Sequence, residues 1–260
     1  MKMFKTLSSL LSTFFFFAVI LIVVIISNLW RFSQSLPDYR QLEKYEPAVT
    51  TRLYAGDGQL LKEYAVEQRL FMPVGKIPDL VKQAFISAED KKFYRHSGID
   101  YVGIVRAVIS NVKNLGSGRR PSGASTITQQ VAKNLFLTPQ KNIKRKVQEL
   151  LMAFWLESKF SKDQILTLYL NRVYMGSGTY GIEAASQKYF HKSSRDLNML
   201  EGAVIAGLLK APARYNPAAD KERALERAAV VLQNMVNAAV ITPEQKAKAL
   251  KMPKIGRAHV

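Results

Sequence analysis

Cysteine is absent from the 260-residue sequence, and histidine occurs only at positions 96, 191 and 259. The missing cysteines exclude disulfide frameworks and cysteine-based zinc or redox sites. Three histidines are also too few to predict a histidine-rich metal site. We therefore expect no metal ligands and no required cofactor.

Acidic residues are scarce, with 20 Asp and Glu against 38 Lys and Arg, so the formal net charge is +18. This charge says nothing about the fold, but it indicates anionic partners. Nucleic acid, acidic lipid headgroups and a phosphorylated substrate all remain open on charge alone.

Charged residues are missing altogether from residues 7–30, which include the run Phe14–Ile26. Such a segment can span a bilayer as one helix, because about 20 apolar residues suffice. A cleaved signal peptide is the alternative, but Ser27-Asn28-Leu29-Trp30-Arg31 offers no cleavage site of small residues. We therefore expect an uncleaved single-pass anchor at 7–30.

The orientation of this anchor follows from the short basic head. Lys2 and Lys5 precede the span, which favours a cytoplasmic tail at residues 1–6 and an exported body. An exported domain rarely meets nucleic acid, and no nucleic-acid-binding motif is evident. We therefore expect the cytoplasmic (inner) membrane as the location, membrane lipid as a partner and no nucleic-acid partner.

The rest of the chain divides into three parts. Residues 31–75 are expected to form a stalk followed by a β-hairpin, because Asp57-Gly58 is a favoured turn between two strand-like runs. Residues 76–254 show helical periodicity and predict a mainly α domain, which leaves the hairpin as the only expected β-structure. Residues 255–260 match a translated sequencing adapter, and we expect them to be an artefactual tail.

Individual polar runs also have ordinary structural explanations. Glu89-Asp90 followed by two lysines is common on exposed helices, and a single His96 is more often structural than catalytic. Ser125 is a plausible helix N-cap after the Gly-rich and basic loop 115–123. Arg145, Lys146 and Glu149 lie at i,i+3 and i,i+4 spacing, which is typical of a solvated salt-bridge face on a helix spanning about 142–160.

Taken together and in order, these runs resemble the family 51 glycosyltransferase domain of class A penicillin-binding proteins and their monofunctional relatives. Two further motifs complete the pattern, the run Ile165–Asn171 with Gly176 and the run Glu201–Gly207 with Pro212 and Pro217. The matching residues of the first three motifs are Glu89, Asp90, Phe93, His96 and Gly98; Gly123, Ser125, Thr126, Gln129 and Gln130; and Arg145, Lys146 and Glu149.

This resemblance implies a lysozyme-like fold and a peptidoglycan glycosyltransferase that polymerises lipid II. A sugar hydroxyl of lipid II would attack the anomeric carbon of the growing glycan strand, with inversion and release of polyprenyl diphosphate. Glu89 matches the family's base and Glu149 its second catalytic carboxylate. The residues expected to bind substrate or support the site are Asp90, Phe93, His96, Ser125, Thr126, Gln129, Gln130, Lys133, Arg145, Lys146 and Asn171.

Such a reaction needs a base near the hydroxyl and cations near the departing diphosphate. Arg145, Lys146 and Lys133 are the candidate cations, with Glu149 organising them. A divalent cation assisting the diphosphate is compatible with this chemistry, but no residue pattern indicates one. An amphipathic region near Gly116–Arg120 is the candidate for dipping into the outer leaflet, and cell-wall synthesis proteins are further candidate partners.

Two other functions remain as alternatives. A lysozyme-like lytic enzyme also pairs carboxylates on an α-helical fold, and a membrane-tethered scaffold could bind cell-wall precursors without catalysis. Many relatives carry a following transpeptidase domain, but only Ser110–Lys113 fits one of its patterns here. We expect no transpeptidase domain in this chain and interpret the chain as a fragment of a bifunctional enzyme.

Overall fold

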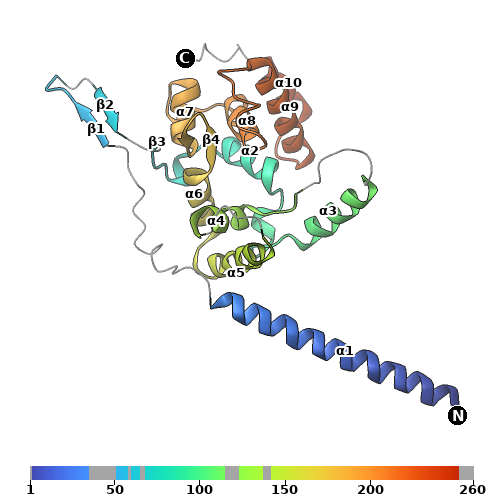
Figure 1. The fold of residues 1–260 in the computed structure, drawn as a ribbon. Coiled ribbons are helices and arrows are strands. Elements are labelled where there is room, and N and C mark those ends of the chain that lie inside the picture. Colours follow the sequence, from blue (N-terminus) through green and yellow to red (C-terminus); the bar gives the residue numbers. More distant parts are fainter. Residues whose placement is uncertain are drawn as a thin grey trace.

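The computed structural model describes residues 2–34, 51–57, 60–64, 68–114, 123–136 and 142–251. Figure 1 shows a largely helical body from which the N-terminal helix and a hairpin project. The helices are α1 (Lys2–Ser33), α2 (Asp79–Glu89), α3 (Tyr101–Lys113), α4 (Ile127–Phe136), α5 (Ile143–Lys159), α6 (Lys162–Arg172), α7 (Ile182–Phe190), α8 (Met199–Leu208), α9 (Lys221–Asn237) and α10 (Pro243–Leu250), with short 3₁₀ turns η2 (Val74–Lys76), η3 (Phe93–Arg95) and η4 (Ser194–Asp196).

The first group of helices packs around α8. Every residue of α8 from Gly202 to Leu208 is buried, as expected for a helix that is apolar on all sides. A Cβ on Gly202 would lie 2.9 Å from a methyl carbon of Val81, so glycine permits α2 to approach α8 closely. On the other side α9 contributes a stripe of buried side chains at helical spacing: Ala224, Ala228, Val231, Leu232 and Met235.

The second group consists of α4, α5 and α6. Helix α4 contacts both α5 and α6. Its buried residues Ile127, Val131 and Ala132 face core residues of these two helices, such as Met152 and Leu170. The two groups share one hydrophobic core. The short segments that link them, between α2 and α3 and before α4, carry the first two sequence motifs.

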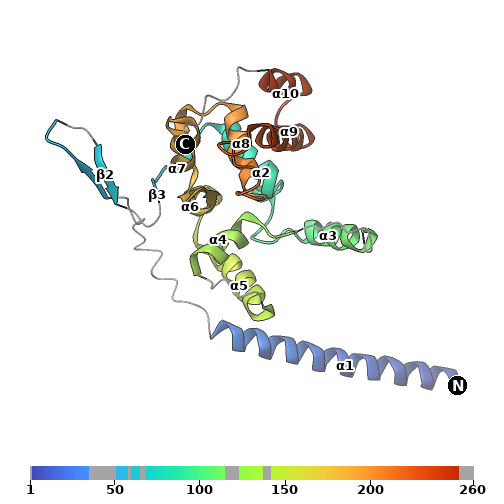
Figure 2. The same ribbon diagram turned by 45° about the horizontal axis from the view of Figure 1, so that its top comes forward.

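Helix α3 differs from the other helices of the body because none of its residues is buried. Four apolar side chains on this helix are at least half exposed: Val102, Val105, Ile109 and Val112. Figures 1 and 2 show α3 extending away from the body on the same side as α1. An apolar stripe without protein cover is unusual in a soluble domain and indicates a contact surface.

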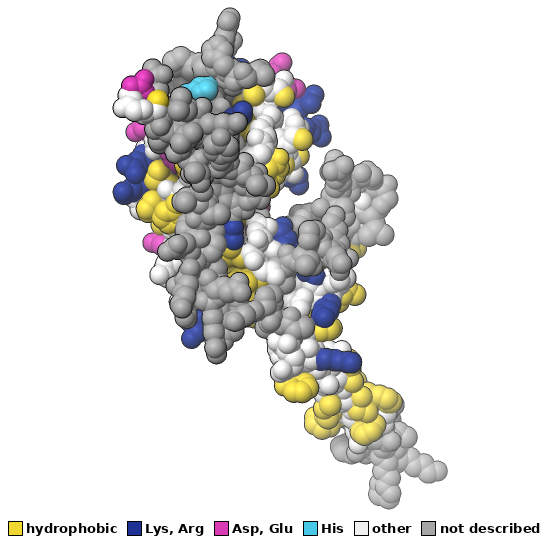
Figure 3. All heavy atoms as spheres, turned by 60° about the vertical axis from the view of Figure 1, so that its left-hand side comes forward, with side chains coloured by type: hydrophobic (Ala, Val, Ile, Leu, Met, Phe, Trp, Pro, Cys, Tyr) yellow, Lys and Arg dark blue, Asp and Glu magenta, His cyan; other side chains and the backbone are white. Residues whose placement is uncertain are grey.

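Helix α1 contains a stretch, Ser12–Ser33, that is long and apolar enough to cross a membrane by length and composition. None of this window is buried against the protein. Figure 3 shows hydrophobic side chains gathered along this projecting helix. The expected apolar helix at 7–30 therefore forms.

The strands make two small sheets. Strands β1 (Thr51–Tyr54) and β2 (Leu60–Tyr64) pair antiparallel, which confirms the predicted hairpin. The expectation that it is the only β-structure was wrong, because β3 (Gln68–Arg69) pairs parallel with β5 (Thr179–Tyr180), which pairs antiparallel with β4 (Tyr174–Gly176). These strands are too short to produce a period-two pattern in the sequence.

The mainly α fold class is confirmed by this architecture. Several sequence-based expectations lie outside the described residues: the stalk over 35–50, most of the loop 115–123 and the tail 255–260. One expectation about a helix start was wrong. Helix α4 begins at Ile127, and its cap is Thr126 rather than Ser125, because the Gln129 backbone N–H donates to the Thr126 hydroxyl.

Candidate active site

Glu89 is the last residue of α2 and lies partly exposed at the end of the helix. Its Oε2 accepts a hydrogen bond from Nε2 of Gln130 on α4, at 2.7 Å. The two helices come from different packing groups, so the core as a whole fixes the distance between them. The candidate base is thus oriented by an amide from the second motif.

Asp90 follows Glu89 but has a different environment. The residue is 6% exposed. Oδ2 accepts a hydrogen bond from the Ile127 backbone N–H at 3.0 Å, and His96 Nε2 lies 3.0 Å from both carboxylate oxygens. A carboxylate at the first N–H of α4 is also favoured by the helix dipole. Asp90 therefore fastens the start of α4 to the loop that carries His96.

The start of α4 is held at further points. The Thr126 backbone N–H donates to Gln129 Oε1, which completes a reciprocal capping box with the Thr126 hydroxyl. That hydroxyl also donates to the Gly98 carbonyl at 2.6 Å. Thr126 and Gln129 are buried in these contacts. Both therefore hold the start of α4 in position from inside the protein.

Gly98 ends the first motif for a steric reason. Its φ is +89°, a backbone conformation that L side chains rarely adopt, and an added Cβ would lie 3.2 Å from the Ala153 carbonyl oxygen of α5. The glycine therefore allows the loop after His96 to pass against α5 and meet Thr126. The first motif is held to both α4 and α5 in this way.

A second polar cluster is built on α5. The Asn142 side chain caps the helix by accepting from the Arg145 N–H. Glu149 is 3% exposed, and its carboxylate pairs with Lys146 Nζ at 2.5 Å and with an Arg145 nitrogen at 3.7 Å. Lys146 Nζ also donates to the Ser125 hydroxyl at 3.0 Å. The predicted Arg145, Lys146 and Glu149 thus form a half-buried ion cluster, and its lysine contacts Ser125 of the second motif.

Tyr169 of α6 is fully buried near the two acids. Burial raises the pKa of its hydroxyl well above the ordinary value, and the nearby Glu89 and Asp90 charges add to the effect. The hydroxyl has no hydrogen-bond partner among the described residues. Tyr169 therefore stays neutral near the two acids.

A partly buried network was missed by the sequence analysis. Glu157 on α5 accepts from the Thr128 hydroxyl and from Lys162 Nζ, each at 2.6 Å. Lys162 also lies over the ring of Phe93, 4.5 Å from its centroid. No local pattern indicates this network, because its members come from four separate segments.

Three other predicted substrate-binding residues are Phe93, Asn171 and Lys133. Phe93 is fully buried and packs inside the core. The Asn171 side chain is occupied by both backbone groups of Met72, accepting from its N–H at 2.7 Å and donating to its carbonyl at 2.8 Å. Lys133 is on the second helical turn of α4 and is partly exposed. Phe93 and Asn171 therefore support the architecture around the site.

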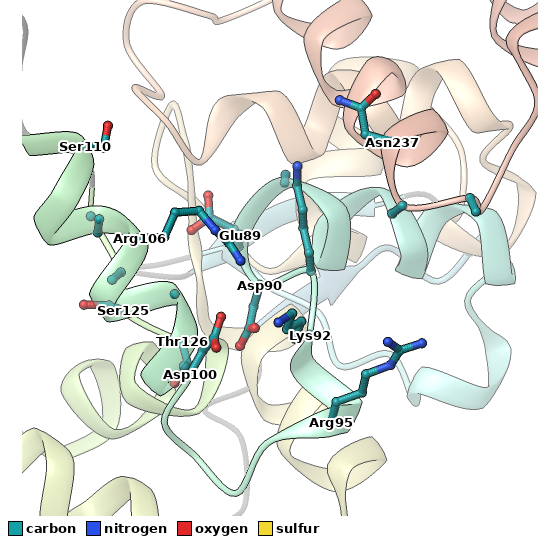
Figure 4. A pocket seen from close by; sticks show the side chains of 18 residues that line it. Glu89, Asp90, Lys92, Arg95, Asp100, Arg106, Ser110, Ser125, Thr126 and Asn237 are labelled. Atoms are coloured by element: carbon teal, nitrogen blue, oxygen red, sulfur yellow. The ribbon is translucent and has the colours of Figure 1, made fainter. Parts of the chain in front are cut away.

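A cavity of about 660 Å³ opens beside Glu89. Figure 4 shows side chains from the end of α2 and the following loop, from α3, from the start of α4 and from the end of α9 around it. Four of its lining residues are cationic and were not predicted as site residues: Lys91, Lys92, Arg95 and Arg106. Gly103, Arg106, Ala107 and Ser110 share i,i+3,i+4,i+7 spacing, a pattern that could have revealed one face of a helix.

The described residues contain no group of three or more His, Cys, Asp or Glu side chains placed to hold a metal ion. The carboxylates of the site are instead engaged by protein donors. Glu89 accepts from Gln130, and Glu149 pairs with Lys146. The arrangement can offer one carboxylate to a hydroxyl and a cationic cluster to an anionic leaving group.

Comparison with known proteins gives the family. The transglycosylase family model matches residues 57–236. Penicillin-binding protein 1A of Rickettsia bellii (strain RML369-C) is 45% identical over 225 residues, which are 86% of this chain and 28% of that protein. Penicillin-binding protein 1A of Neisseria gonorrhoeae is 45% identical over 215 residues, which are 83% of this chain and 27% of that protein.

A crystal structure of penicillin-binding protein 1A from Haemophilus influenzae aligns with 81% of this chain and 21% of that one, at 24% sequence identity and a TM-score of 0.46. The chain spans less than a third of the length of the curated relatives described above. Because the family match covers more than half of the sequence, the chain belongs to the transglycosylase family, as the resemblance to family 51 glycosyltransferases predicted.

Proposed function

We propose that this chain is a peptidoglycan glycosyltransferase that polymerises lipid II into glycan strands and releases polyprenyl diphosphate. The observation that carries the proposal is the pairing of an oriented carboxylate with a separate cationic cluster. Glu89 is held by Gln130 at the edge of the cavity, and Lys146 links Glu149 to Ser125 at the start of the same helix. Family membership supports sugar transfer as the reaction class.

In the proposed step, the attacking hydroxyl of lipid II gives its proton to Glu89 while its oxygen bonds to the anomeric carbon of the growing strand. The bond from that carbon to the diphosphate oxygen breaks, and its electron pair leaves with the diphosphate. Attack from the face opposite the leaving group inverts the carbon. Lys146 and Arg145 stabilise the charge that grows on the diphosphate, because charge-assisted donors suit phosphate oxygens.

Glu149 has a supporting part in this mechanism. Its buried carboxylate is within 4 Å of cationic nitrogens of both Lys146 and Arg145. A buried anion between two cations fixes their positions and limits their mutual repulsion. Lys133 on α4 is a third cation for the diphosphate. Ser125, Thr126 and Gln129 shape the start of α4 between the two carboxylates.

We further propose that the domain works at the outer surface of the cytoplasmic membrane, with α1 as a single-pass anchor and the N-terminus in the cytoplasm. Lipid II keeps its polyprenyl chain in the bilayer, so the site must open there. The candidate loop 116–120 lies outside the described residues, but α3 leads into it and carries the uncovered apolar stripe Val102, Val105, Ile109 and Val112. This stripe suits the acyl boundary of the outer leaflet.

The test is polymerisation of labelled lipid II by the purified chain in detergent, with Glu89→Gln as the key variant. General base catalysis is worth about 10²–10⁴-fold, so the variant is expected to lose at least 100-fold in rate. Glu222→Gln, an exposed acid on α9, is the matched control and should polymerise normally.

Equal polymer yield from Glu89→Gln would refute the assignment of the base. Release of soluble fragments with new reducing ends from preformed peptidoglycan, without polymer from lipid II, would show a lytic enzyme instead. Binding of lipid II with neither product would show a scaffold.

A further inference from the structure

Glu157 on α5 is a mostly buried carboxylate to which the proposed mechanism assigns no part. Its side chain is 10% exposed, and that of its partner Lys162 is 19% exposed. It accepts hydrogen bonds from the Thr128 hydroxyl of α4 and from Lys162 Nζ of α6, both at 2.6 Å. This one carboxylate therefore joins three helices, α4, α5 and α6.

Glu157 also touches the first motif. An added Cβ on Gly98 would lie 3.2 Å from Glu157 Cγ, so the stem of the Glu157 side chain packs against that glycine. The carbonyl of Gly98 accepts a hydrogen bond from the Thr126 hydroxyl. Glu157 therefore lies where the end of the first motif meets the start of the second.

Lys162 is placed to hold the charge of Glu157. It is the first residue of α6, where the helix dipole disfavours a cation. Two contacts offset this disadvantage: the ion pair with Glu157, and the ring of Phe93, whose centroid lies 4.5 Å from Lys162 Nζ. A largely buried carboxylate needs such a partner, because an unpaired one is costly to bury.

The bond to Thr128 bears on the candidate base through the geometry of α4. Thr128 comes two residues before Gln130, whose amide donates to Glu89. Side chains two residues apart on an α-helix differ in direction by about 200°, because there are 3.6 residues per turn. Glu157 therefore holds α4 from roughly the side opposite Glu89. Rotation of α4 about its axis would move the Gln130 amide and the Thr128 hydroxyl away from their acceptors together.

We infer that Glu157 is a positioning residue for the base, and that it acts through Thr128 and Gln130 on the Glu89 carboxylate. This inference rests on the proposed function. Asp90 and Gly98 hold the N-terminal end of α4, and the bond from Thr128 to Glu157 sets the rotation of the helix. A group that only stabilised the domain would lower the melting temperature without acting through the bond between Gln130 and Glu89.

The test measures kcat and the half-saturating concentration of lipid II in polymerisation. Glu157→Met removes the acceptor and the charge and should lower kcat roughly 5- to 50-fold, with half-saturation within about threefold. Glu157→Gln keeps an oxygen for the Thr128 hydroxyl and should stay within about fivefold of the wild-type kcat. Lys159→Met, at an exposed lysine in the last turn of α5, is the control and should match the wild type.

A double-mutant cycle with Gln130→Met separates positioning from general stabilisation. Once Gln130 is replaced, the rotation of α4 no longer reaches Glu89 through its amide. Adding Glu157→Met should then lower kcat by less than about twofold more. Thr128→Val removes the same hydrogen bond with little change of shape and should show the same lack of additivity. It carries the test if Glu157→Met does not fold.

The inference fails if the losses of kcat multiply in the double variants, or if kcat stays within twofold in both Glu157→Met and Thr128→Val. A lower melting temperature at unchanged kcat would show a purely structural role instead. Absence of polymer from the wild-type chain is a different result, because it would overturn the proposed function and this inference with it.

Discussion

The hydrogen bond between Gln130 and Glu89 gives a sharp test of how the base is positioned. The amide nitrogen lies 2.7 Å from the carboxylate oxygen, and the two residues sit on α4 and α2. α4 is in turn fixed to the first motif through Asp90 and Thr126. Replacing Gln130 should therefore free the carboxylate while leaving the helix in place.

The size of the effect follows from the kind of bond. A hydrogen bond to a charged group contributes about 1.5–3 kcal/mol, and each 1.36 kcal/mol changes a rate by about tenfold. If the bond acts mainly by holding Glu89 for proton transfer, Gln130→Met should lower kcat by roughly 10- to 150-fold. The half-saturating concentration of lipid II should change by less than about threefold.

A second substitution reports on protonation. Gln130→Glu places another carboxyl group against Glu89, and two carboxyls this close do not both ionise near neutral pH. The acid limb of the rate–pH profile should therefore move to higher pH. Lipid II polymerisation between about pH 5 and 9 is the assay, and Asn134→Ala, an exposed amide one turn along α4, is the control. A profile that superimposes on the wild type would refute this reasoning, as would full kcat in Gln130→Met.

Three further predictions concern stability, measured by thermal unfolding in detergent. Asn171→Ala removes both hydrogen bonds to the Met72 backbone and should lower the free energy of unfolding by about 2–3 kcal/mol, or the melting temperature by roughly 4–10 °C. The half-saturating concentration of lipid II should stay within twofold of the wild-type value. A binding defect at normal stability would show a substrate contact instead. Tyr169→Phe removes a buried hydroxyl without a partner among the described residues and should leave stability equal or about 1 kcal/mol higher; a clear loss would reveal a partner. Burial, and then the bond to Asp163, raises the pKa of Tyr94 to about 12 from 10.0, so the contribution of Tyr94 to stability is full below pH 10 and is lost as pH rises toward 12. Tyr94→Phe should lessen this alkaline loss of stability by about 1 kcal/mol or less, because the side chain is half exposed. An unchanged slope of stability against pH in this range would contradict the prediction.

The local features of the fold were largely predictable. Helical periodicity predicted α5 almost to its ends, and the Asp57-Gly58 pair predicted the hairpin β1–β2. Both depend on neighbours within a few residues, where sequence spacing and spatial distance agree. The strand β3 was missed because its pairing with β5 joins segments more than 100 residues apart, and β4 and β5 were missed because each has only two or three residues.

The candidate site likewise has some features that local sequence predicted and others that depend on contacts between distant segments. Glu89 at the end of a helix and the Arg145–Lys146–Glu149 cluster follow from sequence spacing. The order of motifs indicated that these groups act together, but it gave neither the donor that orients Glu89 nor the partners of Asp90. Those contacts required α4 to meet the end of α2.

The sequence by itself therefore determined the apolar N-terminal helix, the mainly α body, the family and the identity of the carboxylates and cations. Only the tertiary structure decided what each one faces. It assigned Asn171 to the Met72 backbone, joined Glu157 to Thr128 and turned Arg106 toward a cavity. The physical reason is that a side chain's role depends on groups brought near it by the packing of distant segments, and one-dimensional spacing carries no record of that packing.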